Sequence, residues 1–153
     1  MQRQDLKRIL VPVDGSEQSF SAASFAIEMA KKFEAELQLL HVVTMNQSVR
    51  AVGMYGMSYS DVVEKHMAEA RKEADAWFGR ISEDAEKSGV RASSDMVDTS
   101  ISVVGEIVDY AEKNAIDMIV MGTKGRSGFT RLLMGSVTTG VMTHASCPVL
   151  VVR

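Results

Sequence analysis

The segment from Gly122 to Ser136 has the residue types best suited to chemistry. It reads Gly-Thr-Lys-Gly-Arg-Ser-Gly-Phe-Thr-Arg-Leu-Leu-Met-Gly-Ser, with three basic residues and no acidic one in a chain of net charge −3. Glycines let backbone amides approach a phosphate closely, and a helix starting near Ser136 would add free N–H groups and the positive end of a dipole. The segment therefore favours binding of an anion such as a phosphate.

The segment also has a purely structural interpretation, and two nucleotide-binding motifs are absent from the chain. The glycines could simply form turns and Ser136 could simply cap a helix. The chain contains neither G-x-x-x-x-G-K-[ST] nor G-x-G, so neither a Walker-type nucleoside triphosphatase nor the dinucleotide-binding fingerprint is predicted. Residues 122–136 include no Asp, Glu or His, so we expect no residue there to activate water for hydrolysis.

The elements that must position this segment alternate between short apolar strands and amphipathic helices. Strands separated by helices form right-handed βαβ units, and strands that are apolar almost throughout need cover on both faces. The sequence therefore predicts one α/β domain over 1–153, a three-layer α/β/α sandwich around a five-stranded parallel sheet, with ligands beyond the strand C-termini. Strands are predicted over 9–13, 36–43, 91–98, 117–121 and 148–152, and helices over 16–32, 61–88, 101–114 and 136–145.

Composition excludes several classes of protein. The chain has 153 residues, 17 basic and 20 acidic side chains and one cysteine. A multi-cysteine metal site or disulfide framework is excluded, and a globally basic nucleic-acid binder is disfavoured. No apolar run approaches the roughly 18 residues that span a bilayer, and the N-terminal apolar run is too short for a signal peptide. We expect a cytoplasmic protein that binds neither nucleic acid nor membrane.

The spacing Gly122-x2-Gly125-x9-Gly135-Ser136 resembles the nucleotide-binding signature of the universal stress protein family, in its ATP-binding subgroup. Four further stretches resemble the same family in order: RILVPVDGS from residue 8, LHV from 40, DMIVMG from 117 and CPVLVVR from 147. The resemblance covers essentially the whole chain and is weakest over 44–60 and 89–100. It implies a fold like that of the adenine nucleotide alpha hydrolases, with strand order 3-2-1-4-5.

The resemblance also implies a bound adenine nucleotide, either ATP together with Mg²⁺ or, as alternatives, AMP or ADP. Asp14 would accept hydrogen bonds from the ribose or help hold the cation, and Val42 would offer its backbone N–H and C=O to adenine. The alternative for Asp14 is a helix cap, in a capping box with Glu17. The residues expected to contact the nucleotide are Pro12, Val13, Asp14, Val42, Met121, Gly122, Gly125, Arg126, Gly135, Ser136 and Val137.

The function implied by this resemblance is that of a dimeric, nucleotide-responsive regulator in the stress response, at most a slow ATPase. The uncharged apolar strand 148–152 would be a sheet edge that pairs with its own copy across a two-fold axis. Three rivals stay open: a phospho-acceptor receiver domain with Asp98 as the acceptor, an interaction module that binds no nucleotide, and a flavin-binding electron carrier. The sequence names no pathway, stress or protein partner.

The histidines and the single cysteine are predicted to be structural. His41 lies on a strand and is expected to pack rather than to bind a ligand, while His66 and His144 are alone on helices without metal-ligand spacing. Cys147 is expected to be a small buried apolar residue.

Overall fold

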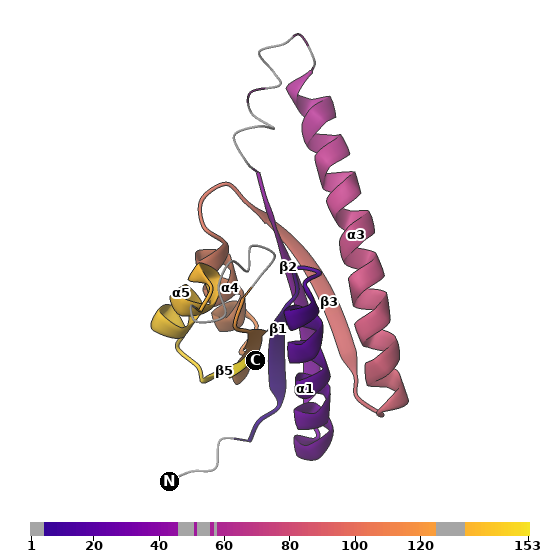
Figure 1. Cartoon of the computed structure of the whole chain (residues 1–153), viewed down its shortest axis with the longest axis vertical. Helices are drawn as coiled ribbons and strands as arrows, with labels where there is room; N and C mark the ends of the chain where they lie inside the picture. The colour runs from indigo at the N-terminus through magenta and orange to yellow at the C-terminus, as the bar shows by residue number, and fades with distance from the viewer. Residues whose placement is uncertain (1–4, 46–50, 52–55, 57, 125–133) are drawn as a thin grey trace.

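Five parallel strands form one sheet in the order β3-β2-β1-β4-β5, as predicted (Figure 1). The computed structural model describes residues 5–45, 51, 56, 58–124 and 134–153. Within them the elements are β1 (Arg8–Pro12), α1 (Glu17–Phe33), β2 (Glu36–Thr44), α3 (Tyr59–Lys87), β3 (Ala92–Thr99), α4 (Val103–Lys113), β4 (Met118–Gly122), α5 (Ser136–His144) and β5 (Val149–Val152).

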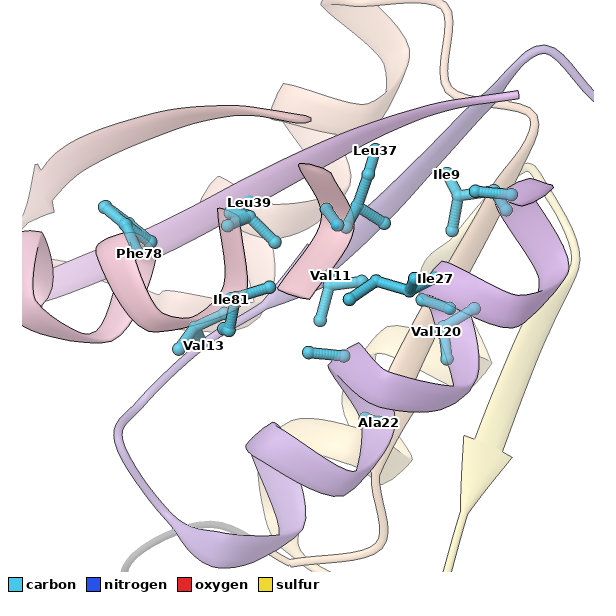
Figure 2. Packing of buried hydrophobic residues seen from close by; sticks show 14 of the residues in the cluster. Ile9, Val11, Val13, Ala22, Ile27, Leu37, Leu39, Phe78, Ile81 and Val120 are labelled. Atoms are coloured by element: carbon cyan, nitrogen blue, oxygen red, sulfur yellow. The ribbon is translucent and has the colours of Figure 1, made fainter. Parts of the chain in front are cut away.

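The sheet is buried on both faces because its central strands are apolar at nearly every position. Ile9 and Val11 of β1 pack in the cluster that α1 and α3 cover, whereas Leu10 packs in the cluster beneath α4 and α5. Adjacent residues of a strand point to opposite faces, so one continuous apolar run feeds both cores. Figure 2 shows the first cluster, where Phe78 and Ile81 of α3 meet side chains of β1 and β2. The three-layer α/β/α sandwich is thus confirmed.

Strand lengths place the C-terminal ends that matter for binding. β1 ends at Pro12, opposite Leu40, whereas β2 continues to Thr44 and stays paired with β3 along this extension. The last residues of β2 therefore extend beyond the end of β1, so their β1-facing edge is unpaired while their other edge stays paired with β3. Within the described residues, no helix is both long enough and apolar enough to cross a bilayer.

Candidate functional site

A pocket of about 510 Å³ opens at the C-terminal ends of β1, β2 and β4. This is the place where the sheet order reverses and where open α/β sheets bind ligands. Gly125 and Arg126, which were also predicted as contacts, lie outside the described residues. The structure brings the other nine predicted site residues together in the lining of this pocket: Pro12, Val13, Asp14, Val42, Met121, Gly122, Gly135, Ser136 and Val137.

At one end of the pocket, the backbone of β2 faces the cavity. The N–H of Val13 donates to the carbonyl of Leu40 at 2.8 Å. Residues two apart on a strand orient their N–H and C=O to the same side, so the peptide groups of Val42 also point toward β1, which has already ended. Among the described residues, neither main-chain group of Val42 has a hydrogen-bond partner. We call this region the base end of the pocket.

Two histidine side chains make hydrogen bonds to backbone carbonyls near Val42. The Nδ1 of His41 donates to the carbonyl of Val13 at 2.7 Å, and the Nε2 of His66, on α3, donates to the carbonyl of Thr44 at 3.3 Å. The ring of His41 also packs edge-on against Trp77, with centroids 5.1 Å apart. His41 is therefore packed, as expected, but both histidines also line the pocket.

Asp14 follows β1 and supports the start of α1. Its Oδ1 accepts from the backbone N–H of Ser16 at 3.0 Å and from the hydroxyl of Ser16 at 2.6 Å. Ser16 is the N-cap, with its Oγ accepting from the N–H of Ser19. The capping box predicted as the alternative for Asp14 and Glu17 is thus wrong, because the helix begins one residue after Ser16. Among the described residues Oδ2 of Asp14 accepts no hydrogen bond, and Asp14 lines the pocket.

At the opposite end, the N-terminus of α5 faces the cavity; we call this the phosphate end. Gly135 occupies the N-cap position without a side-chain cap, and its own N–H donates to the carbonyl of Thr123 at 2.7 Å. The carbonyl of Gly135 accepts from Thr139. Within the described part of the chain, the amides of residues 136–138 have no acceptor, as at any uncapped helix start. The predicted alternative role of Ser136 as a cap is wrong: it is the first helical residue.

Gly122 is glycine because of packing as well as its position in the pocket. A Cβ at this residue would lie 2.9 Å from Cβ and 3.0 Å from the carbonyl carbon of Gln18, in the first turn of α1. The carbonyl of Gly122 accepts from Oγ1 of the buried Thr138 at 2.8 Å. The end of β4 is therefore fixed between α1 and α5.

Side chains from α3 and α4 complete the wall and were not among the predicted contacts. Val103 and Ile107 of α4 add apolar surface, while α3 adds His66, Glu69 and Glu73. His66 lies three residues after Val63 and four before Ala70, two apolar residues on one face of the helix, so helical periodicity could have placed it near the sheet. No group of three or more His, Cys, Asp or Glu side chains among the described residues could hold a metal ion by itself.

Two groups with raised pKa values, Cys147 and Tyr110, do not line the pocket. Burial raises the pKa of the Cys147 thiol, and burial with the nearby Asp95 carboxylate raises the pKa of Tyr110 to about 12. Both groups thus stay protonated near neutral pH, and neither supplies an ionised nucleophile. Cys147 packs against the cluster beneath α4 and α5, as a structural role requires, but it is partly exposed rather than buried as predicted.

Comparisons with known proteins identify the family. The profile of the "Universal stress protein family" matches residues 5–153. Universal stress protein MJ0531 of Methanocaldococcus jannaschii is 37% identical over 147 residues, covering 96% of this chain and 82% of that protein. The structure of universal stress protein UspA from Lactobacillus plantarum superposes with a TM-score of 0.75 at 27% identity, covering 99% of this chain and all (100%) of that one.

Two more distant structures share the fold and contain nucleotides. A universal stress protein in complex with cAMP has a TM-score of 0.72 at 21% identity, covering 98% of this chain and 99% of that chain. One from Archaeoglobus fulgidus in complex with dAMP has a TM-score of 0.66 at 19% identity, covering 98% and 100%. With the profile spanning nearly the whole sequence, this chain belongs to the universal stress protein family.

Proposed function

We propose that this protein binds an adenine nucleotide in the pocket, with ATP and Mg²⁺ as the favoured form, and acts as a nucleotide-responsive regulator of the stress response in the cytoplasm. One observation carries the proposal. A single pocket of about 510 Å³, a typical size for a small-molecule site, has an open strand peptide at one end and an uncapped helix N-terminus at the other.

The base end suits adenine. The N–H of Val42 would donate to a ring nitrogen on the Watson–Crick edge, and its C=O would accept from the exocyclic amino group. The side chains of Ile107 and Met121 give the cavity apolar walls for the faces of the base. These contacts use only backbone groups, so position 42 can bind adenine whatever residue type it carries.

The phosphate end suits the anionic part of the ligand. The free amides of residues 136–138, the hydroxyl of Ser136 and the ammonium of Lys124 would bind phosphate oxygens. Gly125 and Arg126 stay predicted contacts of the same kind. Asp14, with one carboxylate oxygen uncommitted, would bind the ribose or share Mg²⁺ with the phosphates, because this ion usually takes one or two carboxylates alongside phosphate oxygens. When bound, the ion would neutralise phosphate charge.

Fast ATP hydrolysis is not part of the proposal. Among the described residues, the N-terminus of α5 and Lys124 offer amide, hydroxyl and ammonium groups, all of which bind anions, and the proposal assigns the Asp14 carboxylate to the ribose or Mg²⁺ rather than to a water molecule. Hydrolysis, if measured, should be slow. The relatives in complex with cAMP and dAMP support an adenine nucleotide as ligand.

The receiver-domain rival gains no support from the fold. Its acceptor, Asp98, is exposed on the edge strand β3 and is not among the residues that line the pocket with Asp14. A receiver would need the acceptor at the end of a central strand beside the acidic pair.

We further propose a homodimer through β5. β5 is an edge of the sheet and carries only Val149, Leu150, Val151 and Val152, whereas the opposite edge, β3, carries two aspartates. The carbonyls of Pro148 and Val152 bond to β4, so the N–H and C=O of Val151 point to the open edge. An uncharged edge with free peptide groups favours pairing with a second copy.

Val151→Pro tests the dimer. It removes an edge donor without touching the bonds to β4, so the protein should stay folded but run as a monomer in sizing experiments. Val151→Thr, which keeps the N–H, should stay dimeric. A wild-type protein that is monomeric at micromolar concentration would contradict the proposal.

The direct test of the ligand is to denature the purified protein and identify any released small molecule by mass, followed by calorimetry with ATP, AMP, GTP and FMN. We expect an adenine nucleotide to be released or to bind most tightly. Release of a flavin, or no affinity for any nucleotide, would reject the assignment.

A further inference from the structure

The hydrogen-bond ladder between β1 and β2 stops one bond early. In a parallel pair, the bond after Val13 N–H to the Leu40 carbonyl would run from the Val42 N–H to the Val13 carbonyl. That bond is absent among the described residues. The Val13 carbonyl instead accepts from Nδ1 of His41, at 2.7 Å.

We propose that His41 is a positioning residue that keeps the Val42 peptide open for a purine base. Its imidazole N–H takes the place that the Val42 amide would otherwise occupy on the Val13 carbonyl. A buried carbonyl needs a donor, and the donor that the parallel ladder would supply next to the Val13 carbonyl is the Val42 amide. Without the imidazole, the ladder would extend by one bond and close the base end.

The His41 ring is held in this orientation by packing. Trp77 of α3 meets it edge-on at an interplanar angle of 86°. Trp77 in turn lies so close to Gly15 that a Cβ there would overlap Cε2 of the indole. Gly15, with φ of +78°, thus lets the indole approach the turn after β1 and support the imidazole.

His66 supplies a donor to a carbonyl of β2 itself, two residues after Val42. Its Nε2 donates to the carbonyl of Thr44, the next residue of β2 whose peptide groups face the β1 side. Two side-chain donors thus satisfy the carbonyls of Val13 and Thr44 on either side of Val42. The peptide of Val42 is left as an adjacent donor and acceptor.

This arrangement specifies the ligand class. A donor beside an acceptor complements adenine, which presents a ring acceptor next to an amino donor. Guanine presents a ring N–H and a carbonyl on the corresponding edge, so the same pose would set a donor against a donor. The ligand part of this inference rests on the proposed function, whereas the role of His41 in the empty protein does not.

Two substitutions of His41 separate donation from packing. His41→Asn places an amide N–H close to the position of Nδ1, while His41→Phe keeps an aromatic ring for Trp77 but has no donor. In the nucleotide-free protein, NMR hydrogen exchange of the Val42 amide should slow at least about tenfold in His41→Phe, where it bonds the Val13 carbonyl, and stay near the wild-type rate in His41→Asn. AMP affinity by calorimetry should fall at least about tenfold in His41→Phe and stay within about threefold in His41→Asn.

A measurement on the wild-type protein avoids any doubt about folding of the variants. The ¹⁵N shifts of the His41 ring should show Nδ1 carrying a proton; an unprotonated Nδ1 would overturn the proposal, as would a Val42 amide that exchanges equally in wild type and His41→Phe. If wild type binds no AMP but Val42 exchange responds to His41→Phe as expected, the role of His41 stands and the proposed function fails.

Discussion

The base end and the phosphate end of the pocket offer polar groups from different sources. The phosphate end is a helix start without a side-chain cap, preceded by a glycine-rich basic segment, so its residue types are themselves unusual. The base end is formed by β2, which extends beyond the end of β1, and its hydrogen-bond donor and acceptor are the backbone N–H and C=O of Val42. One end is thus defined by residue type and the other by how long two strands are.

From this difference we expect binding at the phosphate end, but not at the base end, to depend on charge. Helix-dipole and ammonium contacts at the phosphate end are electrostatic and respond to salt and to added charge. Peptide contacts at the base end are neutral and depend on geometry. Comparing the affinity for adenosine, which has no phosphate, with the affinity for ATP should therefore distinguish the contributions of the two ends.

The largest expected effect is that of Ser136→Asp on ATP binding. Two like charges about 4 Å apart repel by about 4 kcal/mol at an effective dielectric constant near 20, and a third of this costs roughly tenfold in affinity. We expect calorimetry to show at least that loss for ATP and an unchanged affinity for adenosine. The variant should stay folded, because an acidic residue in the first turn of a helix is favourable.

Met142→Asp is the control for that variant. It adds the same charge further along α5, at an exposed residue that does not line the pocket, and should weaken ATP binding much less. Unchanged ATP affinity in a folded Ser136→Asp protein would remove Ser136 from the phosphate site.

Gly122→Ala tests the fixed strand end that both halves of the pocket share. The new Cβ would lie 2.9 to 3.0 Å from atoms of Gln18, including backbone, so we expect a loss of about 1–3 kcal/mol in unfolding free energy. Gly79→Ala, in α3 with no atom within 4 Å of the new Cβ, should instead gain up to about 1 kcal/mol. Denaturant melts compare the two, and equal stabilities would contradict the close packing of α1 on β4.

Asp14→Asn probes the region between the two ends. The amide oxygen of asparagine can still accept from Ser16, so the start of α1 should be preserved. We expect adenosine and Mg-ATP to lose affinity alike, by about 1 kcal/mol or roughly fivefold, as for a lost hydrogen bond to ribose. A loss confined to Mg-ATP would assign Asp14 to the cation instead.

Salt should give the smallest effect and still distinguish the ends. Raising ionic strength from about 0.05 M to about 0.5 M should weaken ATP binding several-fold because screening shortens to a few Å, and should change adenosine binding by less than about twofold. Isothermal titration at both salt concentrations gives the comparison. Equal salt dependence for the two ligands would show that charge does not separate the ends.

The sheet could be predicted from sequence because its apolar runs are continuous, but element ends could not. The strand predicted from Asp117 begins at Met118, since the Asp117 carboxylate accepts from the N–H groups of Lys7 and Arg8 before the strand starts. The helix predicted from Ile101 begins at Val103, because Ser102 caps it through a bond from the Gly105 amide. Side-chain hydrogen bonds of this kind decide boundaries and leave no periodic signal.

The candidate site divides in the same way. Glycine spacing and charge indicated the phosphate end, and Val42 entered only through the family resemblance, because any residue type can offer a free peptide. The donors of His41 and His66 depend on a strand length and on the placement of α3, neither of which periodicity measures. Apolar residues spaced three and four apart along 61–88 predict a buried face that includes Trp77 and Ile81 but omits Phe78, which is only 4% exposed and packs on the sheet (Figure 2).

Trp77 is the one tryptophan in the chain, and it lies between Gly15 and the His41 ring. The protein therefore carries its own optical reporter at the base end. Indole emission depends on nearby polar groups and on how firmly the ring is held, so a change in the His41 contact should alter the intensity or wavelength of the fluorescence. Events at this end of the pocket can thus be followed in unlabelled protein at low concentration, free of background from a second tryptophan.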